Sequence, residues 1–123
     1  MRVRFTWPGG EAVGTLKDKP AAKALFEALP FSGQANTWGE EVYFEAPVAA
    51  DLDANPQQVV PPGTICFWVQ GGAVALPYGP TPISEGKECR LVTAVNVLGW
   101  LEGDPHVLAS IHEGDTVTAE RAD

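Results

Sequence analysis

Hydrophobic and polar residues alternate at the start of the chain, where Val3, Phe5 and Trp7 are separated by arginine and threonine. A period of two is typical of a strand with one buried face. Residues 8–10, Pro-Gly-Gly, combine a fixed φ with two positions that tolerate positive φ, which favours a turn. Residues 11–16 are therefore expected to return as the second strand of a hairpin.

A helical period follows over residues 17–29. Asp18 or a neighbour is expected to cap this helix, Pro20 suits its first turn, and Pro30 ends it. A single apolar stripe predicts that the helix packs against a sheet and covers one opening or face. The stripe consists of Ala22, Leu25, Phe26 and Leu29.

The middle of the chain is a series of short apolar runs divided by glycine and proline. Residues 47–62 are polar and form the longest candidate loop, and residues 77–84 are a rigid segment with three prolines. Six further strands are expected, at residues 35–38, 41–44, 64–69, 73–76, 91–101 and 116–121.

The segment at residues 94–111 predicts a buried strand, a turn and a short helix. Gly99 interrupts the strand where a bulge, a bend or a close backbone approach is expected. Asp104 and Pro105 suit the cap and first position of a helix. Its apolar face would be Val107, Leu108 and Ile111. The full tally of about eight short strands and two helices predicts a mainly β fold, a closed barrel whose ends are capped by the helices.

Composition narrows the class of protein. The chain has 123 residues, of which 45% are hydrophobic, so one domain spanning residues 1–123 is expected. The net charge is −8 and the eight basic residues are scattered, which argues against a nucleic-acid partner. The N-terminus, MRVRFTWPGG, lacks an apolar signal-peptide core, and no apolar stretch is long enough for a bilayer. We therefore expect a cytoplasmic protein with no membrane partner.

The two cysteines lie in different surroundings. Cys66 belongs to the apolar run at residues 65–68 and is expected in the core. Cys89 lies beside Lys87 and Arg90, which would lower its pKa if the thiol were exposed. Reduced thiols fit a cytoplasmic protein better than a disulfide does.

The order of these elements resembles that of cyclophilins. The C-terminal segment VLGWLEGDPHVLASI is similar to the cyclophilin pattern in which Val-Phe-Gly-x-Val precedes x-x-Gly and Val-Val-x-x-Ile. The chain resembles more closely a small uncharacterised bacterial and archaeal cyclophilin-like family. That likeness lies in the segments NTWGEEVYF (residues 36–44), GPTPIS (79–84) and AVNVLG (94–99). The resemblance implies a cyclophilin-like β-barrel of unknown function.

The region that carries catalysis in cyclophilins departs from their pattern. Cyclophilins with prolyl isomerase activity have a Phe-His-Arg segment after the first helix, whereas residues 31–44, FSGQANTWGEEVYF, contain neither arginine nor histidine. The Phe-x-Met-x-Gln-Gly-Gly strand is also missing, since residues 70–72 supply only Gln-Gly-Gly after a later strand. We therefore assign no catalytic residues. The alternative is a divergent isomerase in which Arg90 replaces the missing arginine.

Motifs for other chemistry are lacking. His106 and His112 are six positions apart and the cysteines have no paired ligand spacing, so no metal site is expected. No phosphate loop, dinucleotide fingerprint or nucleophile elbow occurs, so no cofactor is expected. Glu40 and Glu41 are adjacent, and in a strand they would point to opposite faces. One of them is a candidate buried acid or base.

The aromatic residues suggest a binding site. If Trp38, Tyr43 and Trp68 point to one side, they form an apolar groove, to which polar neighbours add hydrogen bonds or charge. The candidate ligand-binding residues are Asn36, Trp38, Glu40, Tyr43, Trp68, Tyr78 and Arg90. Three hypotheses follow: a module that binds a small molecule or a short proline-containing peptide, the divergent isomerase, and an interaction domain that forms a homodimer.

Overall fold

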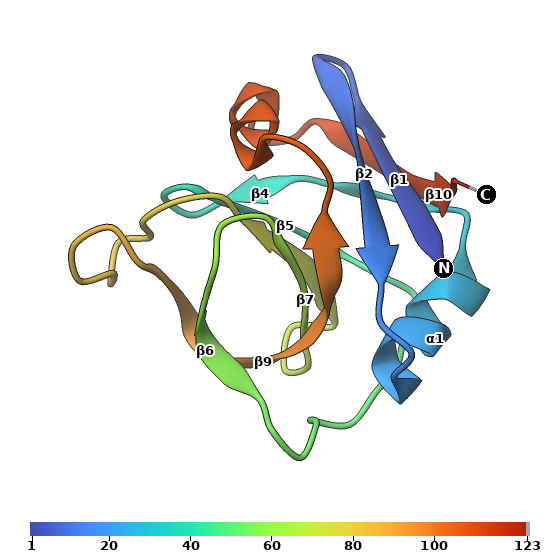
Figure 1. The fold of residues 1–123 in the computed structure, drawn as a ribbon. Coiled ribbons are helices and arrows are strands. Elements are labelled where there is room, and N and C mark those ends of the chain that lie inside the picture. The colour runs from blue at the N-terminus through green and yellow to red at the C-terminus, as the bar shows by residue number, and fades with distance from the viewer. Residues whose placement is uncertain (123) are drawn as a thin grey trace.

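The computed structural model describes residues 1–122, and over these residues ten strands, one α-helix and one 3₁₀ helix occur (Figure 1). The elements are β1 (Arg2–Trp7), β2 (Gly10–Leu16), α1 (Pro20–Ala28), β3 (Phe31–Gln34), β4 (Asn36–Thr37), β5 (Glu41–Glu45), β6 (Gln57–Val60), β7 (Thr64–Trp68), β8 (Ala73–Pro77), β9 (Cys89–Leu101), η1 (Pro105–Ser110) and β10 (Thr116–Arg121).

The strands form an almost closed barrel, as the sequence predicts. Neighbouring strands follow the order β3-β10-β1-β2-β9-β7-β8-β5-β4, and every pairing is antiparallel. The two ends of this order, β3 and β4, are consecutive in the chain and separated only by Ala35. One continuous segment, residues 31–37, thus joins β10 on one side to β5 on the other and brings the two edges of the sheet together.

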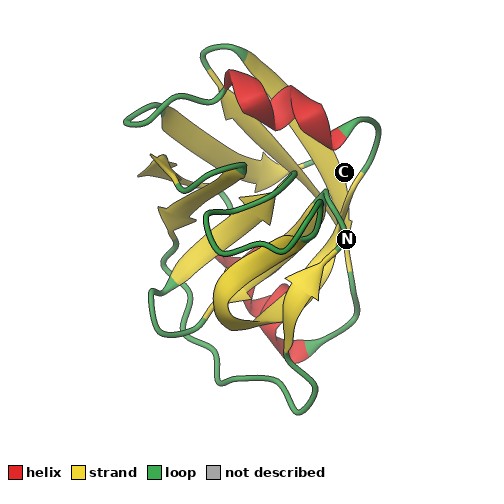
Figure 2. Cartoon of the chain, turned by 90° about the vertical axis from the view of Figure 1, so that its left-hand side faces the viewer, coloured by secondary structure: helices red, strands yellow, loops and turns green. Residues whose placement is uncertain are grey.

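The main core fills the barrel, and the two helices close its ends (Figure 2). Phe5 and Phe44 meet edge to face inside it, with ring centroids 6.0 Å apart. Leu25 of α1 and Leu108 of η1 are completely buried at the two ends. This packing confirms the predicted covering role of the first helix.

The wall formed by β7 and β8 is buried on both faces. Ile65, Phe67, Val74 and Leu76 point into the barrel core, whereas Cys66 and Ala75 point outward into a second apolar cluster. This outer cluster is completed by Val60, Cys89, Leu91 and Val95. The outer face is covered because the first half of β9 leaves the barrel and pairs with β6, while the second half pairs with β7 and β2.

Gly99 lies where β9 passes closest to β2. A Cβ placed on Gly99 would collide with the carbonyl oxygen of Thr15, and the register of β9 against β7 shifts at this level of the sheet. The expected close backbone approach is therefore confirmed. Glycine is required here because the approaching group is backbone and has little freedom to move.

Two strands differ from the sequence prediction. β6 lies inside the predicted loop at residues 47–62, because pairing with β9 orders a segment whose own pattern is polar. β3 was not expected, because serine and glycine are weak strand formers. Gly33 is nevertheless needed, since a Cβ there would lie 2.9 Å from the carbonyl oxygen of Glu45.

The helices also differ from the prediction in detail. Helix α1 starts at Pro20, its N-cap is Lys19, and Asp18 makes no capping bond. The Asp18 carboxylate instead lies 2.8 Å from the ammonium of Lys23. The C-terminal helix is a 3₁₀ helix, in which Asp104 does cap the amide of His106 as expected. With about three residues per turn, Leu108 and Ile111 lie on one face and are buried, whereas Val107 is exposed.

Candidate functional site

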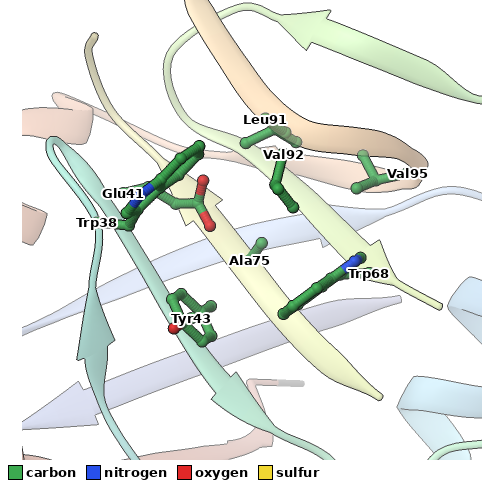
Figure 3. A pocket seen from close by; sticks show the side chains of 8 residues that line it. All are labelled: Trp38, Glu41, Tyr43, Trp68, Ala75, Leu91, Val92 and Val95. Atoms are coloured by element: carbon green, nitrogen blue, oxygen red, sulfur yellow. The ribbon is translucent and has the colours of Figure 1, made fainter. Parts of the chain in front are cut away.

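A cavity of about 190 Å³ lies on the outer face of the barrel wall, beneath the first half of β9 (Figure 3). Its floor is Ala75 on β8, at the centre of the β5–β8–β7 wall, and its roof is formed by β9. It is lined by Trp38, Glu41, Tyr43, Trp68, Ala75, Leu91, Val92 and Val95. Only one of these eight side chains is charged.

Strand register explains why these side chains meet. Tyr43 is paired with Ala75, and Ala75 is paired with Cys66 on the next strand. Because side chains alternate along a strand, Glu41 lies on the same face as Tyr43, while Val42 and Phe44 point into the barrel core. The outer face of β5 thereby presents a carboxyl group beside an aromatic ring.

Three of the aromatic residues singled out in the sequence surround this cavity. The Tyr43 and Trp68 rings meet edge to face with centroids 5.8 Å apart. Trp38 lies across the cavity from Trp68, and the carboxylate of Glu41 points into the space between them (Figure 3). The side chain of Trp68 is held close to the turn after β7, where a Cβ on Gly71 would collide with its ring.

Glu41 is the acidic group of the cavity, in place of the predicted Glu40. Its side chain is buried, with 6% exposed, and its Oε1 atom has no hydrogen-bond partner. Burial raises the pKa of this carboxyl from the ordinary value of 4.5 to about 7. Glu41 was one of the two candidate acids but was left out of the predicted ligand-binding residues, although its position two residues before Tyr43 would have placed it on the aromatic face.

Glu40 points away because the chain turns at Gly39, which has a φ of +61°. The backbone of Glu40 bonds to the 77–84 segment, donating to the carbonyl of Pro80 at 2.9 Å and accepting from the amide of Tyr78 at 2.8 Å. Its exposed side chain lies against Gly79, where a Cβ would collide with the carboxylate. The expectation that the two glutamates point to opposite sides is confirmed, but the buried one is Glu41.

Three further candidate residues lie outside the cavity lining. Asn36 donates to the carbonyl oxygens of Gln34 and Tyr43, each at 3.4 Å. Tyr78 is buried in the main core, with its ring centroid 6.3 Å from that of His106. Arg90 is held by Glu88, with 2.6 Å between Nε and the carboxylate. The structure therefore gathers only Trp38, Tyr43 and Trp68 of the predicted set.

A second buried polar atom belongs to the wall of the site. The indole Nε1–H of Trp68 is inaccessible to solvent and has no acceptor. A buried donor without a partner costs roughly 1–3 kcal/mol. The site thus contains one unpaired acceptor on Glu41 and one unpaired donor on Trp68.

Both cysteine thiols are buried in the outer apolar cluster. Cys66 is in the core as predicted, and burial, together with the negative charge of Glu41, raises its pKa. Cys89 is also buried, and its pKa is raised by burial and by Glu40 and Glu41. A lowered Cys89 pKa was expected only for an exposed thiol, and that condition is not met because Cys89 is buried. Both cysteines are free thiols.

Over residues 1–122, no group of three or more His, Cys, Asp or Glu side chains is arranged to hold a metal ion. In the same part of the chain, no helix combines the length and apolarity needed to cross a bilayer.

The described residues thus form a small β-barrel with a pocket on the outside of its wall. The family model described as Cyclophilin-like matches residues 1–120, and the chain belongs to this family. No curated protein matches the chain.

Two solved structures are similar to the chain. The first is the solution structure of the hypothetical protein AF2241 from Archaeoglobus fulgidus, with 36% sequence identity and a TM-score of 0.85. That match covers 99% of this chain and 95% of AF2241. The second is McbB in complex with tryptophan, with 14% identity and a TM-score of 0.72, covering 98% of this chain and 44% of McbB. The McbB likeness shows a shared fold.

Proposed function

We propose that this cyclophilin-like protein binds a small, largely apolar molecule in the cavity between Trp38, Tyr43 and Trp68. The observation that carries the proposal is the unpaired carboxylate oxygen of Glu41, buried among aromatic and aliphatic side chains. Concave apolar pockets with a few convergent polar groups are typical of small-molecule sites. A ligand that pairs with Glu41 removes the cost of leaving that oxygen unpartnered.

The size of the cavity selects the size of the ligand. An apolar cavity of about 150 Å³ is sufficient for benzene. A volume of about 190 Å³ therefore suits a compound with one ring and a short polar substituent. The structural neighbour McbB, 44% of which is covered by the match, was solved in complex with tryptophan, a small aromatic molecule.

The geometry favours binding over prolyl isomerisation of the usual kind. The cavity lining contains no arginine, and the guanidinium of Arg90 is occupied by Glu88. A proline-containing peptide is therefore a weaker candidate ligand than a compact single-ring compound, and belongs in the screen as a comparison.

A thermal-shift screen of single-ring compounds and proline peptides tests the proposal. Val92 forms part of the roof and is 55% exposed, so Val92→Phe is expected to block the cavity without disturbing the core. Val59→Phe is the matched control, since Val59 is an exposed valine on β6 outside the lining. We expect compounds that raise the Tm of the wild type and of Val59→Phe but not of Val92→Phe. The proposal fails if no compound raises the Tm, or if the two variants respond alike.

A further inference from the structure

We propose that the ligand of this cavity is an organic cation, a protonated amine whose N–H groups donate to Glu41 while its apolar body packs between the aromatic rings. This inference rests on the proposed function and adds the chemical class of the ligand.

The unpaired acceptor can be satisfied by a donor from outside the protein. Oε1 of Glu41 is buried and has no hydrogen-bond partner among the described residues. Among the described residues, the other buried side-chain atom without a hydrogen-bond partner is Nε1 of Trp68, and the two side chains stand on different sides of the cavity (Figure 3).

The missing countercharge points to a cationic donor. The eight lining residues include no lysine, arginine or histidine. The nearby titratable groups are Tyr43 in the lining, Glu40 at the adjacent position and the thiols of Cys66 and Cys89, and none of these becomes cationic. A buried carboxylate without a partner is strongly disfavoured. A positively charged group on the ligand would supply the ion-pair partner that the protein itself does not provide.

The aromatic walls suit the same ligand. A cation close to the face of a tryptophan or tyrosine ring is attracted by the ring quadrupole, and the attraction increases when water is excluded. Trp38 and Trp68 flank the carboxylate, and Tyr43 lies below it (Figure 3). A net charge of −8 also favours the approach of cations over anions.

Isothermal titration calorimetry with benzylamine, benzyl alcohol and benzoate tests the inference. The three probes share one ring and differ in charge. At about pH 8 benzylamine, which is then a cation, is expected to bind at least tenfold more tightly than benzyl alcohol. Benzoate is expected to bind most weakly. Ionisation of Glu41 is needed for pairing, so benzylamine affinity is expected to fall about tenfold between about pH 8 and about pH 6. Each benzylamine bound at about pH 6 is then expected to release nearly one proton.

Two variants separate Glu41 from the general acidity of the protein. Glu41→Gln should abolish both the preference for benzylamine and its pH dependence. Glu40→Gln removes the same charge from the adjacent exposed position and should retain both. If benzyl alcohol or benzoate binds as tightly as benzylamine, the inference is overturned but the proposed function is supported. If none of the three probes binds, the proposed function fails for ligands of this size and the inference fails with it.

Discussion

Replacing Glu41 with glutamine should stabilise the protein at neutral and alkaline pH. Glutamine has the shape of the protonated side chain and does not ionise. In the folded protein burial raises the pKa of Glu41 to about 7, whereas in the unfolded chain the carboxyl has its ordinary value of 4.5. The folded state therefore holds this proton more tightly than the unfolded state does.

The sign and size of the effect follow from that difference. Below about pH 4.5 both states are protonated, and Glu41 contributes no penalty. As the pH rises from about 4.5 to about 7, the unfolded chain loses the proton first and the free energy of unfolding decreases. Above about pH 7 the wild type is less stable by up to about 3 kcal/mol than a chain without this ionisation. Glu41→Gln should therefore equal the wild type in acid and exceed it by that amount at about pH 8.

Urea unfolding of both proteins across this pH range measures the effect, because other titrating groups cancel in the difference. Glu40→Gln is the matched control, and should keep the decline in stability that the wild type shows. A difference between wild type and Glu41→Gln that stays constant from about pH 5 to about pH 8 would refute the assignment of Glu41 as a desolvated acid.

Three further predictions concern positions that shape the barrel and its site. Gly99→Ala should destabilise the protein by about 3 kcal/mol or more in urea unfolding, because its methyl group meets β2 backbone; an unchanged midpoint contradicts this. The buried Asn96 accepts from the amide of Asp53 at 2.6 Å and donates to the carbonyl of Asp51 at 2.9 Å. Asn96→Ala should lower the free energy of unfolding by about 2 kcal/mol. It should also speed amide hydrogen exchange in the loop that contains Asp51 and Asp53, but not in β1. Gly71→Ala should displace Trp68 and shift tryptophan fluorescence; an unaltered spectrum would show that the ring is not held there.

The barrel was predictable because the sequence patterns that indicate its strands and helices are local and recur along the chain. Alternation in residues 2–7, the amphipathic stripe of α1 and the capped turn at Asp104 each depend on a few neighbouring residues. β6 and β3 were missed because a polar or glycine-containing segment has little tendency to form a strand by itself. These two segments become strands only by pairing with partners distant in the sequence.

The site was predictable only in part for a related reason. The aromatic character of Trp38, Tyr43 and Trp68 is visible in the sequence, but which glutamate joins them depends on the turn at Gly39. The register of β5 then decides which face each side chain occupies. The roof residues Leu91, Val92 and Val95 read simply as part of a buried strand, because nothing local shows that β9 leaves the barrel halfway along its length.

The closure of the barrel through residues 31–37 has a consequence for how the chain folds. β10 pairs with both β1 and β3, and the hydrogen bond between Ser32 and Thr118 joins positions 86 residues apart. During synthesis, β1 and β3 therefore have no partner on these edges until β10 has left the ribosome. Such late, long-range pairing is slow and leaves strand edges open to other chains. The interval before β10 pairs is thus a step at which the open edges of β1 and β3 expose this chain to aggregation.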